Sequence, residues 1–402
     1  MPRASHATAA TADRAFLVAA DMKGALLPAA ESLDELAELA RTAGAEVVGR
    51  TTQRMAHPNV TTYIGKGKVD EVVEASRDLD ANVVIFDDEL APSQQRNLEK
   101  ALDVKVIDRT ALILDIFATR AHTAEGRLQV SLAQMQYLLP RLAGQWSHLE
   151  RMEGAIGTRG PGETQIETDR RLIRSRISRI KRELEDVRTR RALYRRQRER
   201  AGVPVVALVG YTNAGKSTLM RALSGAHVLT EDRLFATLDP VTRRLRLPTG
   251  ETVLLTDTVG FIQKLPTDLV AAFRATLEEL QEADLLIHVI DIAHPNASEQ
   301  AQSVDFTLAD LGVAEKPVLL ALNKVDLLRD PQGRRVQSLD GAHALIAGPS
   351  LPAPGVVLVS ATKRWGLDAL LARIATGLDG GLSATTAAAV ELLARPPRQA
   401  AG

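Results

Sequence analysis

Cysteine is absent from the 402-residue sequence, which excludes disulfide bonds and thiolate metal sites. No run of about 18 apolar residues occurs, so we expect no transmembrane helix. The first 15 residues lack the apolar core of a secretory signal, and we expect them to form a disordered leader. These absences favour a protein of the reducing cytoplasm.

A net charge is also lacking, because 50 Lys and Arg residues balance 50 Asp and Glu residues. The charge is unevenly placed, however: residues 170–200 hold 14 Lys and Arg against 4 Asp and Glu. A charged run is often only a solvated helix face. An excess this large on one segment repels itself and favours binding to a polyanion. We therefore expect a nucleic-acid partner, with RNA and DNA both open.

Apolar segments alternate with amphipathic ones over residues 16–120, which predicts a small parallel α/β domain. Strands are expected at 16–20, 45–49, 82–87 and 104–108, and helices at 32–44, 69–80 and 91–102. Ser32 is the expected N-cap of the first helix. Before the second helix, Gly65 and Gly67 flank Lys66. Such a loop either binds phosphate or is a tight turn with solvated lysines.

Two segments between residues 121 and 200 carry apolar residues at alternating steps of four and three, which predicts two long packed helices. The two seams are Leu128, Leu132, Met135, Leu139 and Leu142, and Ile173, Ile177, Ile180, Leu184 and Val187. The glycine-rich stretch 154–165 between them is not expected to be helical. We therefore expect an antiparallel helical hairpin with a tip at about 144–166. Because the seams can satisfy each other, we expect a monomer.

A second α/β domain is expected over residues 203–378, followed by a loose tail over 379–402. Its first strand leads into "GYTNAGKS", which matches the phosphate-binding pattern G-x-x-x-x-G-K-[ST]. Gly210 and Gly215 allow backbone amides to approach the α- and β-phosphates. Lys216 supplies a cation to the β- and γ-phosphates, and Ser217 offers a hydroxyl to Mg²⁺.

Three further segments follow in the order of a GTPase. Asp257 can hold Mg²⁺ through water, and the Gly260 amide can contact the γ-phosphate. Asp326 in "NKVD" can accept two hydrogen bonds from guanine, whereas adenine has no such donor pair. Backbone N–H groups at 360–362 can reach the base oxygen. The set predicts GTP as substrate and argues against a P-loop ATPase or helicase.

Phe261 stands where many GTPases have a glutamine that orients the attacking water. A phenyl ring cannot hold a water, so we expect slow intrinsic hydrolysis that a partner stimulates. Phe261 either turns away from the γ-phosphate until a partner docks or simply packs. The hydroxyl that completes the Mg²⁺ shell is expected from Thr237, with Thr230 and Thr242 as weaker candidates.

The segments "GYTNAGKSTL", "LFATLDPVTRR", "DTVGFIQKLPTDLVAAFRATLEE" and "NKVD" resemble the HflX family of translational GTPases. So do "YIGKGKVDE" and "IGTRGPGETQIETDRR", and the resemblance covers roughly residues 15–375. It implies a protein that binds the large ribosomal subunit and its RNA and splits or rescues stalled or idle ribosomes. It also implies ribosome contacts from the hairpin tip, at Arg159, Gly160, Pro161 and Gly162.

The resemblance further implies that Thr237 is the switch threonine and that residues 235–239 contact the nucleotide. The expected catalytic residues are Lys216, Thr237 and Gly260, and the expected Mg²⁺ ligands are Ser217, Thr237 and, through water, Asp257. The expected nucleotide contacts are Gly210, Tyr211, Thr212, Asn213, Ala214, Gly215, Lys216, Ser217, Thr218, Phe235, Ala236, Thr237, Leu238, Asp239, Asp257, Thr258, Val259, Gly260, Asn323, Lys324, Val325, Asp326, Ser360, Ala361 and Thr362. An alternative function is a GTP-gated RNA-binding factor in ribosome assembly or stress response, with incidental hydrolysis.

Overall fold

The structure, a computed structural model, describes residues 12–24, 26–142, 161–225, 234–235, 237–264, 280–346 and 355–380. These residues form two compact units, one drawn from 1–116 and 134–176 and the other from 117–133 and 177–402. The division falls within three helices, α4 (Arg109–Arg120), α5 (Ala124–Leu138) and α7 (Pro161–Ala201). The domain limits expected from the sequence stay a prediction.

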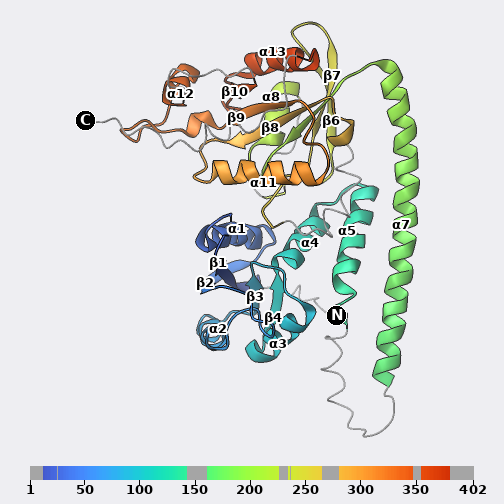
Figure 1. The fold of residues 1–402 in the computed structure, drawn as a ribbon, viewed down its shortest axis with the longest axis vertical. Coiled ribbons are helices and arrows are strands. Elements are labelled where there is room, and N and C mark those ends of the chain that lie inside the picture. The colour runs from blue at the N-terminus through green and yellow to red at the C-terminus, as the bar shows by residue number, and fades with distance from the viewer. Residues whose placement is uncertain are drawn as a thin grey trace, which may run out of the picture. The chain divides into compact units, whose positions relative to one another are not determined.

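A four-stranded parallel sheet in the order β2-β1-β3-β4 forms the centre of the first unit (Figure 1). Its strands are β1 (Arg14–Met22), β2 (Glu46–Met55), β3 (Val83–Phe86) and β4 (Lys105–Asp108). Helix α1 (Ala29–Thr42) covers one face, and α2 (Lys66–Asp78) and α3 (Pro92–Leu102) cover the other. Apolar side chains of the strands, such as Val18, Val84 and Phe86, pack against Val72 and Leu98 of these two helices. The small parallel α/β domain is confirmed.

Helix α1 begins earlier than the sequence predicts, at Ala29 after Pro28. Ser32 is therefore not the N-cap; it is buried within the helix, and its hydroxyl donates to Asp87 at 2.7 Å. The other carboxylate oxygen of Asp87 accepts from the buried guanidinium of Arg109 at 2.6 Å. Ser32 thus completes a buried ion pair between the end of β3 and the start of α4, because a buried charge needs its hydrogen bonds satisfied.

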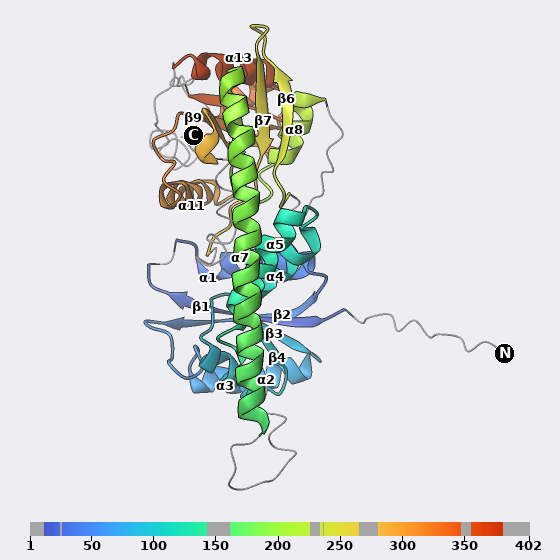
Figure 2. The same ribbon diagram turned by 90° about the vertical axis from the view of Figure 1, so that its right-hand side faces the viewer.

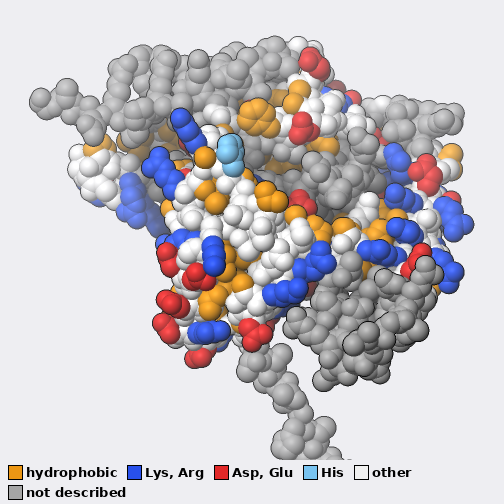
Figure 3. All heavy atoms as spheres, turned by 60° about the horizontal axis from the view of Figure 1, so that its bottom comes forward, with side chains coloured by type: hydrophobic (Ala, Val, Ile, Leu, Met, Phe, Trp, Pro, Cys, Tyr) orange, Lys and Arg blue, Asp and Glu red, His pale blue; other side chains and the backbone are white. Residues whose placement is uncertain are grey.

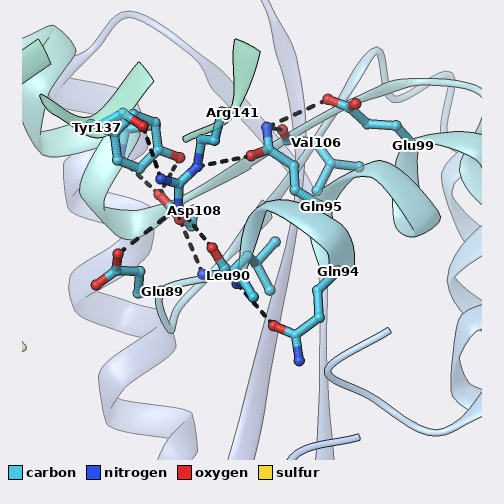
Figure 4. A network of polar contacts seen from close by, with 11 residues as sticks. Glu89, Leu90, Gln94, Gln95, Glu99, Val106, Asp108, Tyr137 and Arg141 are labelled. Carbon is cyan, nitrogen blue, oxygen red and sulfur yellow. Dashed lines mark hydrogen bonds and ion pairs between the residues drawn. The ribbon is translucent and has the colours of Figure 1, made fainter. Parts of the chain in front are cut away.

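A polar network at the end of β4 holds the C-terminal part of α5 in the first unit (Figure 4). The buried carboxylate of Asp108 accepts from the amide of Leu90 at 3.1 Å and from the hydroxyl of Tyr137 at 2.9 Å. Arg141 donates to Asp108 at 3.3 Å and to the carbonyl of Leu90 at 2.7 Å, and its guanidinium lies 3.6 Å from the centroid of the Tyr137 ring. These bonds satisfy a buried charge with several donors at once.

Helices α5 and α7 form the predicted antiparallel hairpin, and α7 runs unbroken over 41 residues (Figure 2). The predicted seam of α7 is its least exposed stripe: Ile180 is buried, and Ile173, Ile177, Leu184 and Val187 are half-buried. Within the second unit, Glu125 of α5 pairs with Arg191 of α7 at 2.8 Å. The alternating four-and-three spacing therefore identified the packed face of this helix.

The start of α7 differs from the sequence expectation. The helix begins at Pro161, within the stretch that was expected to be non-helical, and Gly162 is its second residue. Proline is tolerated in a first helical turn because the first amides have no partner in the helix. The rest of the expected tip, with Arg159 and Gly160, lies outside the described residues.

The second unit is built on a six-stranded sheet in the order β10-β9-β8-β5-β7-β6, in which only β6 is antiparallel to its neighbour. The strands are β5 (Val205–Val209), β6 (Val241–Arg246), β7 (Thr252–Asp257), β8 (Leu285–Asp291), β9 (Val318–Asn323) and β10 (Val356–Leu358). The helical segments are α8 (Lys216–Ser224), α11 (Ala297–Asp310), the 3₁₀ turn η3 (Val325–Leu327), α12 (Leu339–Ile346) and α13 (Leu367–Leu378).

Helices cover both faces of this sheet, with α8 and α13 on one side and α11 on the other (Figure 1). The loops that follow β5, β7 and β9 leave the carboxyl ends of parallel strands at one edge of the sheet, where open α/β sheets bind ligands. Among the described helices, none is both long and apolar enough to span a bilayer.

Candidate nucleotide site

The loop between β5 and α8 has the backbone of a phosphate-binding loop. Gly210 has φ 150° and Gly215 has φ 96°, which side-chain-bearing residues rarely adopt. A Cβ on Gly210 would lie 2.3 Å from the carbonyl oxygen of Val289, and one on Gly215 would lie 2.3 Å from Nδ2 of Asn323. Both glycines are therefore required by conformation and by space. The loop ends at the N-terminus of α8, where amides favour an anion.

Lys216 is buried at the centre of this loop. Its ammonium donates to the carbonyl oxygens of Gly210 at 3.0 Å and Tyr211 at 2.8 Å. Burial lowers the pKa of Lys216 to about 8, an effect that nearby Asp257 partly opposes. The ammonium is thus hydrogen-bonded to neutral carbonyls, and a phosphate oxygen would be a stronger partner.

Ser217, Thr237 and Asp257 come together beside the loop. The Ser217 hydroxyl lies 2.8 Å from the Thr237 hydroxyl and donates to Oδ2 of Asp257 at 2.6 Å. Thr237 donates to the same oxygen at 3.1 Å. Oδ1 of Asp257 is buried and has no hydrogen-bond partner among the described residues. Burial also raises the pKa of Asp257. Two hydroxyls and a buried carboxylate with an unused oxygen match the oxygen ligands that Mg²⁺ prefers, so these residues fit the ion.

Gly260 and Phe261 close over the phosphate loop. A Cβ on Gly260 would lie 2.9 Å from Cα of Thr212 and 3.1 Å from Nζ of Lys216, so only glycine fits. The Phe261 amide donates to the carbonyl of Gly210 at 3.1 Å, and its carbonyl accepts from the amide of Thr212 at 2.7 Å. The hydroxyl of Thr212 is buried without a partner among the described residues. The segment after β7 therefore lies directly against the loop.

Asn323 joins the phosphate loop to the loop after β10. Its Nδ2 donates to the carbonyl of Ala214 at 2.9 Å, and its Oδ1 accepts from the amide of Ala361 at 3.1 Å. The Ser360 hydroxyl donates to Oδ1 of Asp326 at 2.6 Å and so orients that carboxylate. No other described group bonds this carboxylate, which leaves it acceptor capacity for a base.

The structure thus brings together the expected residues of the phosphate loop and the Asp257–Gly260 segment. The Asn323–Asp326 turn and the loop 360–362, which are expected to contact the base, lie beside them. Of the three candidate threonines, Thr237 lies beside Asp257, Thr242 bonds to Thr256 on the neighbouring strand at 2.9 Å, and Thr230 lies outside the described residues. Ala236 also lies outside them. The Lys324 ammonium pairs with Asp291 at 2.8 Å. Contact of these residues with a nucleotide stays a prediction.

Asp239 is placed differently from its neighbours in the expected list. Its Oδ2 accepts from the amides of His122 and Thr123, at 2.8 and 2.9 Å, just before helix α5. The carboxylate is therefore engaged by a helix N-terminus, and any contact of Asp239 with a nucleotide falls to its main chain. Sequence reasoning missed His122 and Thr123. A threonine before an apolar seam signals an N-cap, but its partner is 116 residues away in sequence.

His288 on β8 is a further buried polar residue that the sequence did not single out. Its Nδ1 has no hydrogen-bond partner among the described residues and lies 3.7 Å from the carboxylate of Asp305 on α11. Burial lowers the pKa of His288 to about 3, and it raises the pKa of Asp305 to about 6. At neutral pH the contact therefore joins a neutral imidazole to a carboxylate, and it is not an ion pair.

The glycine-lysine loop of the first unit keeps both of its interpretations. Helix α2 begins at Lys66 after Gly65, whose amide donates to the side chain of Gln53 at 2.8 Å. The Lys68 ammonium donates to the hydroxyl of Thr51 at 3.1 Å and pairs with Glu71 at 2.5 Å. Phosphate binding by this loop stays a prediction.

The order of strand, phosphate loop, Asp257–Gly260 segment and Asn323–Asp326 turn defines a P-loop GTPase. The model of the 50S ribosome-binding GTPase matches residues 205–324, that of the GTP-binding GTPase N-terminal region matches 30–118, and that of the GTP-binding GTPase middle region matches 120–198. The chain belongs to the HflX family of GTPases, as its sequence resemblance predicts, and it is an enzyme that binds and hydrolyses GTP.

Two GTPase HflX relatives support this assignment. The chain is 56% identical over 298 residues to the GTPase HflX of Caldanaerobacter subterraneus, which covers 74% of this chain and 70% of that protein. It is 51% identical over 305 residues to the GTPase HflX of Escherichia coli, covering 76% and 71%. A solved GTP-binding protein from Sulfolobus solfataricus in complex with GDP is 26% identical, covers 91% of this chain and 99% of its own, and has a TM-score of 0.44.

Proposed function

We propose that this GTPase binds the large ribosomal subunit and splits or rescues stalled or idle ribosomes in the cytoplasm. The proposal is supported by the family description of a 50S ribosome-binding GTPase and by the GTPase HflX relatives. The observation that carries it is the basic face of α7, which has the charge to bind ribosomal RNA. We also propose that the protein acts as a monomer, because the apolar seams of its helical hairpin can pack against each other.

The charges of α7 are presented to solvent. Exposed Lys and Arg residues lie on α7 at positions 171, 174, 176, 179, 181, 182, 188 and 190, while the apolar seam faces inward. Figure 3 shows a cluster of blue side chains with few red ones at the right-hand side, where α7 runs in Figure 1. Arg179 and Arg188 pair with acidic neighbours of the same helix. The excess positive charge remains, and it favours phosphate.

The nucleotide site would act by placing charge around the triphosphate. Lys216 would hold the β- and γ-phosphates, and the Gly260 amide would donate to the γ-phosphate. Ser217, Thr237 and, through water, Asp257 would hold Mg²⁺. The ion, when bound, neutralises charge on the phosphate oxygens. Asp326 and the amides of residues 360–362 would select guanine. Phe261 offers no group to orient water, so hydrolysis would be slow until a partner completes the site.

Sedimentation of ribosomes tests this function. Stoichiometric protein with a non-hydrolysable GTP analogue should convert intact ribosomes to free subunits, and GDP should not. If no free subunits appear, the proposal that this protein splits ribosomes is wrong. Large subunits should raise the GTPase rate more than free RNA does. Equal stimulation by both would favour the alternative, a GTP-gated RNA-binding factor of ribosome assembly or stress response.

A pair of charge-reversal substitutions tests the role of α7 in binding the large subunit. Arg171→Glu with Arg176→Glu changes two exposed residues of α7, and Arg41→Glu with Arg77→Glu makes the same change of charge on α1 and α2. Only the first pair should weaken binding to the large subunit, and its dependence on salt should become shallower by about one unit per lost phosphate contact. Equal loss with both pairs would show that net charge and not α7 carries the binding.

A further inference from the structure

The carboxylate of Asp239 caps the N-terminus of α5, the first arm of the hairpin, and all the residues involved belong to the second unit. Oδ2 of Asp239 accepts from the amides of His122 and Thr123, at 2.8 and 2.9 Å, and its Oδ1 accepts from the Thr123 hydroxyl. Thr123 Oγ1 in turn accepts from the amide of Gly126 at 2.9 Å. Asp239 thus meets three donors at the start of α5, where the helix dipole also favours a negative charge.

Gly126 permits this close approach. A Cβ on Gly126 would lie 2.3 Å from Oδ1 of Asp239 and 3.3 Å from its Cγ. No real Cβ contact is that short, so any side chain here must displace the carboxylate. The glycine lies in the first turn of α5, where it weakens the helix relative to alanine. Its presence is explained by the contact with Asp239 and not by the helix.

The capping residue is two positions from the switch threonine. Thr237 Oγ1 lies 2.8 Å from the Ser217 hydroxyl and 3.1 Å from Oδ2 of Asp257. On the other side of Thr237, the ring of Phe235 packs edge to face on Phe117 of α4, with centroids 4.7 Å apart. Two residues of chain span at most about 7 Å, so Thr237 stays within that distance of both Phe235 and Asp239 while their contacts hold.

We propose that Asp239 is a positioning residue for GTP hydrolysis: it holds Thr237 in place to complete the Mg²⁺ shell and couples that shell to the N-terminus of α5. The inference rests on the Mg²⁺ role proposed for Thr237. Coupling is reciprocal, so Mg²⁺ and GTP at Thr237 stabilise the cap, and a partner that holds α5 stabilises Thr237. Glu125, in the same first turn, pairs with Arg191 of the basic helix α7, which gives such a partner a direct route to the cap.

The first test is the Mg²⁺ requirement of nucleotide binding and hydrolysis. Asp239→Ala should raise the half-saturating Mg²⁺ concentration about tenfold, as loss of residues that orient metal ligands commonly does. Gly126→Ala should have the same effect by displacing the carboxylate. Asp239→Asn keeps one oxygen acceptor and should fall between these variants and the wild type.

A matched glycine provides the control. Gly341 lies in the first turn of α12, and its amide bonds to the hydroxyl of Ser338 at 3.1 Å, as that of Gly126 bonds to Thr123. A Cβ on Gly341 would meet nothing nearer than 3.3 Å, and that neighbour is a side-chain methyl. Gly341→Ala should therefore leave the Mg²⁺ requirement unchanged.

The second test measures the cap itself by amide hydrogen exchange. The amides of Gly126 and Arg127 bond to Thr123 and remain as reporters when Asp239 is replaced. In the wild type, Mg²⁺ with a non-hydrolysable GTP analogue should slow their exchange about tenfold relative to GDP. Asp239→Ala should remove this difference between the two nucleotide states. A cap that serves only the stability of α5 would give equal protection in both states.

The outcomes separate this inference from the role of Thr237. If Thr237→Ala leaves the Mg²⁺ requirement unchanged, the Mg²⁺ role of Thr237 is wrong. If Thr237→Ala raises it while Asp239→Ala and Gly126→Ala keep wild-type values and wild-type exchange differences, only the positioning role of Asp239 is overturned. Should Asp239→Ala fail to fold, Asp239→Asn decides the question, because an asparagine oxygen still caps the helix.

Discussion

The amide of Thr212 donates to the carbonyl oxygen of Phe261 at 2.7 Å, which binds the phosphate loop to the residue that follows Gly260. A second bond, from the Phe261 amide to the carbonyl of Gly210, makes this contact a short parallel bridge. The side chain of Phe261 is only 2% exposed. The residue in the place of a water-orienting glutamine therefore holds the site closed through its backbone, and its burial favours a packing role for the ring.

Substitution of Phe261 separates packing from gating. Phe261→Leu keeps an apolar side chain and should cost about 1 kcal/mol of unfolding free energy. Phe261→Gln buries an amide without a matched partner and should cost about 2–4 kcal/mol. Neither change should raise the intrinsic hydrolysis rate per folded molecule. Urea unfolding and single-turnover GTP hydrolysis check this, and a faster Gln variant would show that the ring blocks the water.

Asp326→Asn should change the choice of base. An asparagine offers one oxygen acceptor and one amide donor, so the two charge-assisted bonds to guanine are lost and GTP affinity should fall about 10–100-fold. Xanthosine triphosphate carries a carbonyl in place of the guanine amine, and the Asn variant should prefer it. Competition binding measures the ratio of the two nucleotides. Ser360→Ala removes the bond that orients Asp326 and the bond that the Lys363 amide donates to the same hydroxyl, and it should weaken GTP binding without reversing the preference.

Asp305 should make stability depend on pH. Burial raises the pKa of Asp305 to about 6, so the folded protein holds this proton more tightly than the unfolded chain. The buried carboxylate therefore lowers the free energy of unfolding by its full amount above pH 6. This destabilisation disappears as the pH falls toward 4. Asp305→Asn should be more stable than the wild type by about 1–3 kcal/mol at pH 7.5, with the gap narrowing toward pH 4. The lowered pKa of His288 acts in both proteins and cancels in the comparison.

Chemical denaturation at pH 7.5, 6 and 4.5 measures this gap. The matched control is Asp310→Asn, at the exposed end of the same helix, which should show no such narrowing. A constant advantage of Asp305→Asn at all three values would contradict the titration and point to a hydrogen bond from the new amide to Nδ1 of His288.

The sequence predicts the phosphate loop well because glycine geometry and local order decide it. Gly210 and Gly215 are required by backbone conformation, and the strand and helix around them follow from local apolar patterns. The seam of α7 is predictable for the same reason, since Ile173 to Val187 repeat at helical spacing. Such features depend on residues that are neighbours along the chain.

What the sequence misses depends on contacts between distant residues. Ser32 has the chemistry of an N-cap, yet its hydroxyl serves Asp87, 55 residues away. Asp239 follows Leu238 in a segment expected to face the nucleotide, and only the fold brings His122 and Thr123 to its carboxylate. Pro161 signals a loop or a helix start equally, and the structure decides for the helix start. In each case a side chain with several possible partners takes the one that tertiary packing supplies.

Removal of the hairpin tip tests whether the tip serves ribosome binding while the nucleotide site alone serves GTP hydrolysis. Deletion of residues 154–160 stops before the first residue of α7 and leaves the whole nucleotide site in place. Intrinsic GTP hydrolysis and GTP affinity should stay at wild-type values, since every residue grouped around the phosphate loop lies in the second unit. Ribosome splitting and stimulation by the large subunit should be lost. If splitting survives the deletion, the tip is only a turn between two helices, and the basic face of α7 must carry the contact alone.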